Sequence, residues 1–197
     1  MRYELQTEEV IERFRRTGAL LDGHFILSSG LHSLQYLQCA LLLQHPAEAN
    51  RFGRALAERF RNERIETVAA PAIGGLVIGY EVARHLKARF IWTERSEGRM
   101  ALRRGFSVRS GENALVIEDV ITTGGSTRET IEVLRNEGAQ VVGAGSIIDR
   151  SSGRAEVGVP RIALATLDVP AVAAELCPAC ARGEASTKPG SRKTVGG

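Results

Sequence analysis

The chain has 197 residues, 43% of them hydrophobic and 25% charged, which fits one globular domain and argues against wholesale disorder. The net charge is +3, and the last fifteen residues carry +2 of it, so the near-neutral body gives no general case for a nucleic-acid surface. No apolar run approaches the roughly 18 residues of a membrane span, acids stand where a secretory signal would be apolar, and three cysteines fit a reducing compartment. We therefore expect a cytoplasmic protein that binds neither nucleic acid nor a membrane.

The N-terminal part of the chain predicts two helices with an irregular segment between them. Residues 7–16 have an apolar stripe at helical spacing, Thr7 can cap the helix, and Gly18 can end it. Residues 23–37 are interrupted by Gly, Ser and His and predict loops and short strands. Pro46 can start the second helix, in which apolar side chains recur every fourth residue.

From residue 67 the pattern alternates between short apolar runs and helical segments. Strand–turn–helix–strand alternation predicts βαβ units, and hence an α/β fold with a mostly parallel sheet. The predicted strands are 67–70, 88–92, 114–117 and 141–148, the predicted helices are 76–86 and 127–137, and the turns are 71–75 and 122–126. Residues 183–197 are small, polar and rich in Gly, Pro and Ser, and they predict a disordered tail after a domain of residues 1–182.

The segment 114–127, ALVIEDVITTGGST, carries the clearest chemical signal. Its apolar strand delivers Glu118 and Asp119 to a carboxyl edge, where open α/β sheets bind ligands. The turn 122–126 then runs into a helix N-terminus, where backbone N–H groups and hydroxyls suit a phosphate. Gly124 and Gly125 let the backbone close around the anion.

Two acids beside a phosphate turn indicate a particular ligand. Carboxylates do not belong against a phosphate, but they hydrogen-bond sugar hydroxyls, so the combination describes a pentose 5-phosphate site. Negative charge near the ring would also stabilise an oxocarbenium-like transition state if the bond at C1 breaks. The turn lacks the Lys of a Walker loop and the spacing of a dinucleotide fingerprint, and a plain surface βα turn with incidental acids is the less favoured interpretation.

VIEDVITTGGST resembles the phosphoribosyl-diphosphate (PRPP) motif of type I phosphoribosyltransferases. More narrowly, residues 18–180 resemble the orotate phosphoribosyltransferases, through GALLDGHFILSSGLHS near the start, APAIGG at 70–75 and IIDRS at 147–151. The resemblance implies a central, mostly parallel sheet flanked by helices, with a small N-terminal hood of about residues 1–45. It also implies transfer of phosphoribose from PRPP to orotate, giving orotidine 5'-monophosphate and diphosphate in pyrimidine biosynthesis. The implied cofactor is Mg²⁺, held mainly by substrate and water rather than by protein ligands, and the implied assembly is a homodimer with a shared active-site loop.

The resemblance also implies residue roles. Glu118 and Asp119 would hold the ribose hydroxyls, and the turn would bind the 5-phosphate. Arg150 would meet the orotate carboxylate, which suits a planar guanidinium; without the resemblance it would be a surface arginine beside Asp149. The implied PRPP-binding set is Glu118, Asp119, Val120, Ile121, Thr122, Thr123, Gly124, Gly125, Ser126 and Arg95, and the implied orotate-binding set is Thr122, Arg150 and Ser28.

An arginine-rich stretch covers residues 93–109 and matches a mobile basic loop of the family. Positive charge there would stabilise the leaving diphosphate, and closure would exclude water. We expect Arg95 and Arg99 to be catalytic together with Asp119, whereas Arg103 and Arg104 are equally consistent with a solvated hairpin.

Two positions depart from the family pattern. Many members carry a basic residue where this chain has Ser28, and many carry Tyr-Lys where it has Ile73-Gly74. If Ser28 does not compensate by hydrogen bonds, the loop arginines must carry more of the diphosphate charge.

Cys177 and Cys180 form a C-x-x-C pair that could be half a zinc site. No second pair follows, and all four histidines are far away in sequence, so zinc would require Cys39, a distant His or a second subunit. We favour a plain reduced pair over zinc and over a redox motif. His24 and His32 lie in the substrate-side segment and receive no proton-transfer role.

Two other functions are open to this sequence. One is transfer of phosphoribose to a different nucleobase, because details of the pocket decide the choice of base. The other is a non-catalytic PRPP-sensing regulator that binds nucleic acid, because the same fold can serve several functions.

Overall fold

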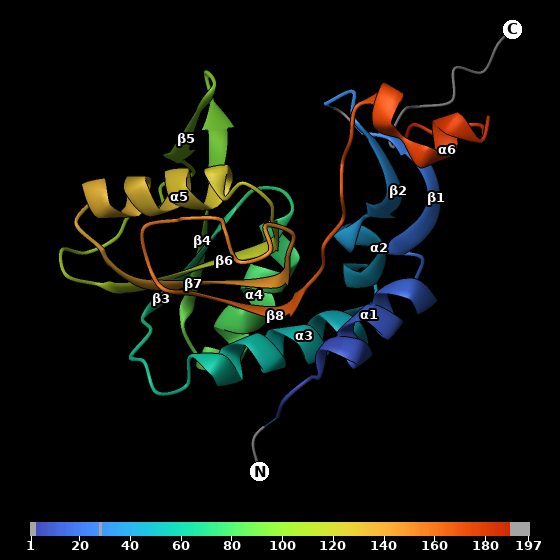
Figure 1. Ribbon diagram of the computed structural model, residues 1–197. Helices are drawn as coiled ribbons and strands as arrows, with labels where there is room; N and C mark the ends of the chain where they lie inside the picture. Colours follow the sequence, from blue (N-terminus) through green and yellow to red (C-terminus); the bar gives the residue numbers. More distant parts are fainter. Residues whose placement is uncertain (1–2, 28, 190–197) are drawn as a thin grey trace, which may run out of the picture.

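A six-stranded sheet forms the centre of the larger part of the protein in the computed structural model, which describes residues 3–27 and 29–189 (Figure 1). The strand order is β5-β4-β3-β6-β7-β8, and every neighbouring pair is parallel except β4–β5. The strands are β3 (Thr67–Pro71), β4 (Arg89–Ser96), β5 (Arg99–Leu102), β6 (Asn113–Ile121), β7 (Gln140–Asp149) and β8 (Arg161–Thr166). The prediction of an α/β fold with a mostly parallel sheet is confirmed.

Helices cover both faces of this sheet, as Figure 1 shows. α4 (Gly75–Leu86) and α3 (Pro46–Arg59) lie on one face, and α5 (Gly125–Asn136) lies on the other. The central strands are therefore buried on both sides and read as continuous apolar runs, as parallel strands between helices do. All five residues of β3 are buried, and in β6 burial extends from Ala114 through Glu118.

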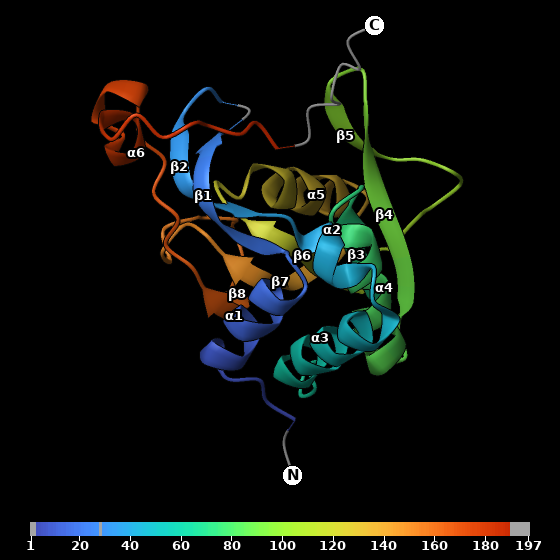
Figure 2. The same ribbon diagram turned by 90° about the vertical axis from the view of Figure 1, so that its right-hand side faces the viewer.

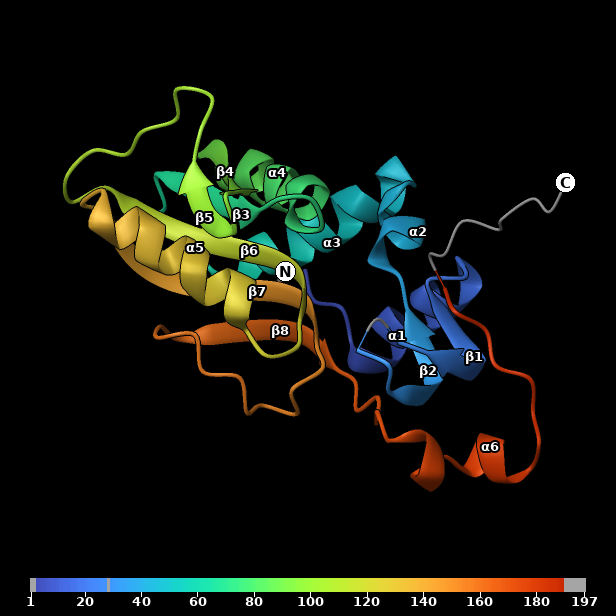
Figure 3. The same cartoon turned by 90° about the horizontal axis from the view of Figure 1, so that it is seen from above.

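The N-terminal hood consists of α1 (Thr7–Arg16), a hairpin of β1 (Leu20–Ile26) and β2 (His32–Leu37), and the short α2 (Cys39–Leu43). Seen from above, the hairpin stands beside the sheet (Figure 3), and a view from the hood side has the hairpin in front of it (Figure 2). Phe14 and Leu20 belong to the same hydrophobic cluster as Ile117 and Ile147 of the sheet, so the hood shares the core of the main domain.

The chain after β8 leaves the sheet and crosses to the hood, where it forms the short helices η1 (Ala174–Leu176) and α6 (Pro178–Ala181) (Figure 1). Val172 pairs with His32 of β2, and Thr187 pairs with Phe25 of β1. The prediction of a disordered tail differs from the structure at residues 183–187: the N–H groups of Gly183 and Glu184 bond to α6, and Thr187 exchanges backbone hydrogen bonds with β1. Residues 190–197 lie outside the described part.

Most predicted elements occur close to their expected bounds, and the differences have local causes. Thr7 is the first helical residue rather than the cap, and no side chain caps α1 at Gln6. Gly18 does follow the helix end, with the positive φ that favours glycine there. Glu118 and Asp119 lie within β6, which continues to Ile121 through pairing with β7. The short elements α2, β8, η1 and α6 were not predicted.

The strand order creates a topological switch point at the carboxyl ends of the central strands β3 and β6. β3 is followed by α4 and β4 on one side, whereas β6 is followed by α5 and β7 on the other. The chain thus turns away in opposite directions at the carboxyl ends of β3 and β6, which is where open α/β sheets bind ligands. Among the helices of the described residues, none has the length and apolar character to cross a membrane.

Candidate active site

The turn between β6 and α5 forms a small hollow of about 70 Å³. The N-cap of α5 is Gly124, which has no side chain to bond the first N–H groups, and the Gly125 N–H makes one long contact with Thr123 Oγ1 (3.4 Å). The first turn of α5 is therefore suited to receive an anion. Gly124 has φ +75°, and a Cβ there would lie 2.8 Å from Val157 Cγ1, so only glycine fits. The hollow is lined by Glu118, Val120, Ile121, Thr122, Thr123, Gly124, Gly125, Ser126 and Thr127, which brings together nearly all of the predicted PRPP-binding residues.

Glu118 and Asp119 form a buried acidic pair beside this hollow. Only 8% of Glu118 is exposed. Burial, together with the neighbouring Asp119, raises the pKa of Glu118 to about 9. Burial also raises the pKa of Asp119, although hydrogen bonds from Glu118 and from the Val120 backbone N–H (2.8 Å) oppose the shift. The pair therefore keeps a proton at neutral pH.

The turn after β3 lies directly against these acids. A Cβ on Gly74 would be 2.8 Å from Asp119 Oδ1, and one on Gly75 would be 2.9 Å from the Ile117 carbonyl oxygen and 3.3 Å from Glu118 Oε1. The predicted small-residue segment 70–75 thus meets the acidic segment at the switch point. The preceding Ile73 is 83% exposed.

Arg150 follows β7 at the same edge of the sheet. Its backbone N–H donates to the Ile121 carbonyl (2.8 Å), so it lies beside the phosphate turn, and with Thr122 and Thr123 it lines a second hollow of about 370 Å³. Burial lowers the pKa of its half-buried guanidinium, and the buried Nε has no hydrogen-bond partner among the described residues. A buried, unpartnered donor is costly unless a ligand satisfies it.

Asp149, the neighbour of Arg150 in sequence, has other partners among the described residues. It accepts hydrogen bonds from Arg161 Nη1 (2.8 Å) and from Ser151 Oγ (2.6 Å) and N–H (2.7 Å). These bonds fix the turn that follows β7 and leave the Arg150 guanidinium available. Asp149 and Arg161 were missed as supporting residues, because a contact between positions 12 apart on different strands leaves no local pattern.

The arginines of the stretch 93–109 lie at two opposite ends of the sheet. Arg95 forms an ion pair with Glu129 of α5 (3.0 Å) and donates to the Gly98 carbonyl (2.9 Å) in the β4–β5 hairpin. Arg99 is exposed on the same hairpin. Arg109 instead binds Glu66 (3.2 Å) and Glu112 (3.3 Å) at the amino end of the sheet, far from the predicted chemistry.

Four other residues bear on the predicted site: Ser28, Arg103, Arg104 and Cys39. Ser28 lies outside the described residues. Arg103 and Arg104 both pair with Glu94, at 3.6 and 3.0 Å, as in an ordinary hairpin. Cys39, which the sequence did not connect with the site, is buried, and burial together with Asp119 and Glu118 raises the pKa of its thiol well above its usual range.

The sheet, the switch point and the phosphate turn with its acidic pair define a class of protein that binds a sugar phosphate at the carboxyl edge of an α/β domain. Comparison with known proteins agrees: residues 40–163 match the model of the phosphoribosyl transferase domain.

Proteins that are similar to this chain over nearly its full length show which family within this class it belongs to. The chain is 50% identical to an orotate phosphoribosyltransferase from Desulforamulus reducens over 96% of this chain and 99% of that protein. It is 52% identical to one from Thermotoga petrophila over 94% and 97%. The crystal structure of orotate phosphoribosyltransferase from Aeropyrum pernix matches with a TM-score of 0.65 and 28% identity, covering 80% of this chain and 93% of that one. The chain belongs to the orotate phosphoribosyltransferase family.

Proposed function

We propose that the protein transfers the phosphoribosyl group of PRPP to orotate, forming orotidine 5'-monophosphate and diphosphate. The observation that carries the choice of base is the position of Arg150, whose unpartnered guanidinium nitrogen lies beside the phosphate turn. Orotate carries a carboxylate, and a planar guanidinium binds a carboxylate well. The other nucleobases have no carboxylate to satisfy this arginine, and near-full-length similarity to orotate phosphoribosyltransferases disfavours both alternative functions.

The acidic pair suits a ribose held by its 2- and 3-hydroxyls. A carboxyl pair that keeps one proton can donate one hydrogen bond and accept others, which matches two neighbouring hydroxyls. The remaining negative charge lies close to the ring. In the displacement, the bond from C1 to the diphosphate oxygen breaks, a bond from C1 to the orotate nitrogen forms, and the proton of that nitrogen passes to the departing diphosphate or to water. Positive charge on the ring is greatest between bond breaking and bond formation and is stabilised by Glu118 and Asp119.

The 5-phosphate would occupy the hollow formed by the turn and the start of α5. Thr122, Thr123 and Ser126 offer hydroxyls there, and the helix start offers N–H groups and a positive dipole end. Fixing the phosphate and the hydroxyls at opposite ends of the sugar leaves C1 as the mobile centre of the reaction. The leaving diphosphate would lie against the turn at residues 72–75 and be covered by Arg95 and Arg99 of the β4–β5 hairpin.

Mg²⁺ fits this site as a substrate-bound ion. Mg²⁺ prefers oxygen ligands, and the acidic pair supplies carboxylate oxygens at this edge of the sheet. A separate cluster of possible metal ligands among the described residues consists of two His and two Cys, which do not suit Mg²⁺. When bound, Mg²⁺ neutralises charge on the leaving diphosphate. Glu118 and Asp119 would act on the ion indirectly, by holding the ribose hydroxyls that also contact it.

We further propose a cytoplasmic homodimer without nucleic-acid or membrane partners. Three exposed apolar side chains support the dimer. Ile73, in the turn before α4, is 83% exposed, and Val77 and Tyr80, three residues apart on one face of α4, are 45% and 57% exposed. The free cysteines fit a reducing compartment.

The proposal is tested by incubating the pure protein with PRPP, Mg²⁺ and orotate and following the loss of orotate absorbance, with adenine, hypoxanthine, xanthine and uracil in parallel. Among these five bases, we expect turnover only with orotate. Arg150→Gln should lower kcat/KM for orotate about 100-fold, as the loss of a charge-assisted contact implies, while the KM for PRPP changes little. Arg135→Gln, at the far end of α5, is the matched control and should behave as the unaltered protein. No turnover with orotate, or equal turnover with uracil, would contradict the proposal.

A further inference from the structure

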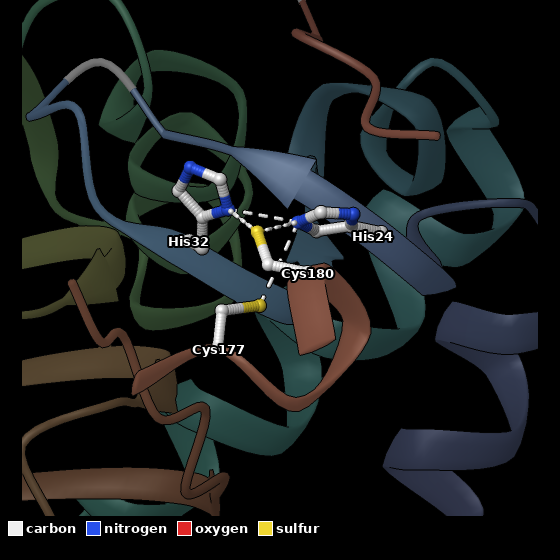
Figure 4. Close-up of side chains that lie close together, drawn as sticks. All are labelled: His24, His32, Cys177 and Cys180. Atoms are coloured by element: carbon white, nitrogen blue, oxygen red, sulfur yellow. Dashed lines mark hydrogen bonds between the residues drawn. The ribbon is translucent and has the colours of Figure 1, made fainter. Parts of the chain in front are cut away.

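Four side chains that are far apart in the sequence meet in the hood. His24 comes from β1 and His32 from β2, whereas Cys177 and Cys180 come from the turn and helix at α6 (Figure 4). One ligand atom from each, two ring nitrogens and two sulfurs, lies within 4.8 Å of every other. The two histidines and Cys177 are buried, and Cys180 is half-buried.

The spacing of these atoms matches a tetrahedral metal site. Zinc bonds of about 2.0–2.1 Å to nitrogen and 2.3 Å to sulfur place tetrahedral ligands about 3.3–3.8 Å apart. Here His24 Nε2 lies 3.6 Å from both sulfurs, and His32 Nδ1 lies 3.2 Å from Cys180 Sγ. The two ring nitrogens are 2.8 Å apart and would separate slightly around an ion.

Hydrogen bonds outside the cluster prepare the ligands. His24 Nδ1 lies 2.9 Å from the carbonyl oxygen of Glu184, which can only accept, so Nδ1 carries the proton and Nε2 presents its lone pair inward. Such a bond from the distal ring nitrogen is the usual partner of a metal-binding histidine. At Cys177, the backbone N–H groups of Cys180 and Ala179 point at the sulfur, as suits a thiolate ligand.

The local backbone also aims the side chains at one point. The β1–β2 register shifts between Asp22 and Phe25, which marks a β-bulge, and His24 and Phe25 are consequently both buried although neighbouring strand residues normally face opposite sides. The bulge turns His24 toward the side on which His32 lies. His32 is held in turn by backbone bonds to Val172 in both directions, at 2.8 and 2.9 Å.

A thiol pair alone does not explain this arrangement. A redox pair requires no ring nitrogens, yet His24 Nε2 contacts both sulfurs (Figure 4). The four protein ligands complete a tetrahedron and leave no open position, which distinguishes a structural zinc site from a catalytic one. Two sulfurs and two nitrogens in this geometry select zinc over Mg²⁺.

The hood is also a region that benefits from a metal. A two-stranded sheet is marginally stable by itself, and small units are commonly stabilised by disulfides or metals. Here the chain segment 172–187 contacts the hairpin at isolated bridges and at this cluster. We propose that His24, His32, Cys177 and Cys180 bind one Zn²⁺ that fastens the C-terminal segment to the hood hairpin.

The test measures metal in the full-length protein. After purification without chelators or a metal-affinity step, elemental analysis should find about one zinc per chain. Titrating the thiols with a mercurial should release this zinc to a chromophoric chelator as Cys177 and Cys180 react. After replacement by Co²⁺, the spectrum should show the intense visible bands of tetrahedral cobalt and a thiolate-to-cobalt charge-transfer band.

Variants distinguish this cluster from adventitious binding. Cys180→Ser and His32→Gln should each reduce bound zinc at least about tenfold, as loss of one of four ligands implies. Cys39→Ala and His85→Asn change the same residue types outside the cluster and should keep the full zinc content. If a ligand variant does not fold, the mercurial and cobalt measurements on the unaltered protein still decide the question.

Three results would overturn the proposal: no zinc in the purified protein with none taken up on reconstitution, iron in place of zinc, or zinc that persists in both ligand variants. A Cys177–Cys180 disulfide in freshly prepared protein would contradict it as well. Each readout is independent of orotate turnover, so failure of the zinc site and failure of the proposed reaction are distinguishable.

Discussion

Glu118 ties catalysis to stability because its carboxyl is buried in an uncharged form. Its pKa is about 9 in the folded chain, against 4.5 for an ordinary Glu. Between these values the folded protein keeps a proton that the unfolded chain releases, so this group makes the folded state less stable as the pH rises from about 4.5 to 9. Burial of a carboxyl against a second acid is thus maintained at a cost in stability, as is common at functional sites.

We predict that Glu118→Gln stabilises the protein and impairs it as an enzyme. The amide cannot ionise, so the free energy of unfolding at pH 8 should exceed that of the unaltered protein by about 1–2 kcal/mol, and the gain should shrink toward pH 4.5. The kcat/KM for PRPP should fall at least about tenfold, because the amide changes the hydrogen bonds that the carboxyl pair offers to the ribose hydroxyls. Urea unfolding at pH 5 and pH 8 measures the first effect. The exposed Glu132→Gln on α5 is the control, and an equal gain at both pH values would argue against the buried proton.

Gly74 gives a second prediction at the scale of one residue. Its added Cβ would lie 2.8–3.0 Å from three atoms of the Asp119 carboxylate, so Gly74→Ala should displace that group. We expect kcat/KM for PRPP to fall at least about tenfold, with the free energy of unfolding changed by less than about 1 kcal/mol, because an exposed turn residue with φ −55° accepts alanine.

Gly53→Ala provides the opposite pattern as a control. Its Cβ would meet Glu81 where α3 and α4 pack, away from the site, so it should lower stability while kcat is retained. If Gly74→Ala lost activity only in proportion to lost folded protein, the proposed contact with Asp119 would have no catalytic meaning.

At the scale of secondary structure, the β4–β5 hairpin carries the charge that the proposed reaction requires. Arg95, Arg103 and Arg104 are engaged by carboxylates in the unliganded structure, whereas Arg99 is exposed near the hairpin turn. We predict that Arg99→Ala lowers kcat about 100-fold, the scale of one preorganised charge contact in a transition state, with little effect on unfolding. Steady-state kinetics at saturating PRPP measures it. Arg109→Gln changes another arginine of the same stretch at the opposite end of the sheet and should retain kcat. Equal losses in both variants would show that the total positive charge of the stretch, rather than a contact made by Arg99, supports kcat.

The elements that the sequence predicted well are those with a local pattern. Residues 114–117 form a continuous apolar run, and 7–16 and 127–137 have helical periodicity, so their strands and helices could be placed within a few residues. β8 escaped prediction because RIALAT is short and runs directly into Leu167 without a turn residue, and its place is set by pairing with β7. The phosphate turn and acids were found because they are contiguous in the chain.

Contacts between distant segments could not be predicted in the same way. The sequence suggested that the cysteine pair lacked partners, because His24 is 153 residues from Cys177 and the bulge that turns it inward has no strong signature. Likewise, the contact of Gly74 with Asp119 depends on β3 and β6 being neighbours in the sheet. Residue types and spacing indicate which chemistry a chain can perform, whereas topology decides which residues perform it together.

At the scale of the whole molecule, the exposed apolar face of α4 leads to a prediction about the proposed dimer. The exposed side chains of Val77 and Tyr80 lie on the solvent side of α4, whose other face is buried by Ile78 and Val82 against the sheet. Val77→Glu with Tyr80→Glu should convert a dimer of 21.3 kDa chains to monomers, because charges would be buried at the interface. Light scattering after size exclusion measures the mass. Leu176→Glu, which changes an apolar residue 76% exposed on the hood, should leave the dimer intact.

Mixed dimers test whether the hairpin acts on the partner's site. If Arg99 reaches across the interface, an Asp119→Asn chain paired with an Arg99→Ala chain contains one site with both substitutions and one with neither. Co-refolding the two inactive variants in equal amounts should then restore about a quarter of the original activity, because half of the dimers are mixed and each has one intact site. If Arg99 serves its own chain, every site carries one substitution and no activity returns. The double-Glu monomer should be inactive in the first case and active in the second, so the two measurements must agree.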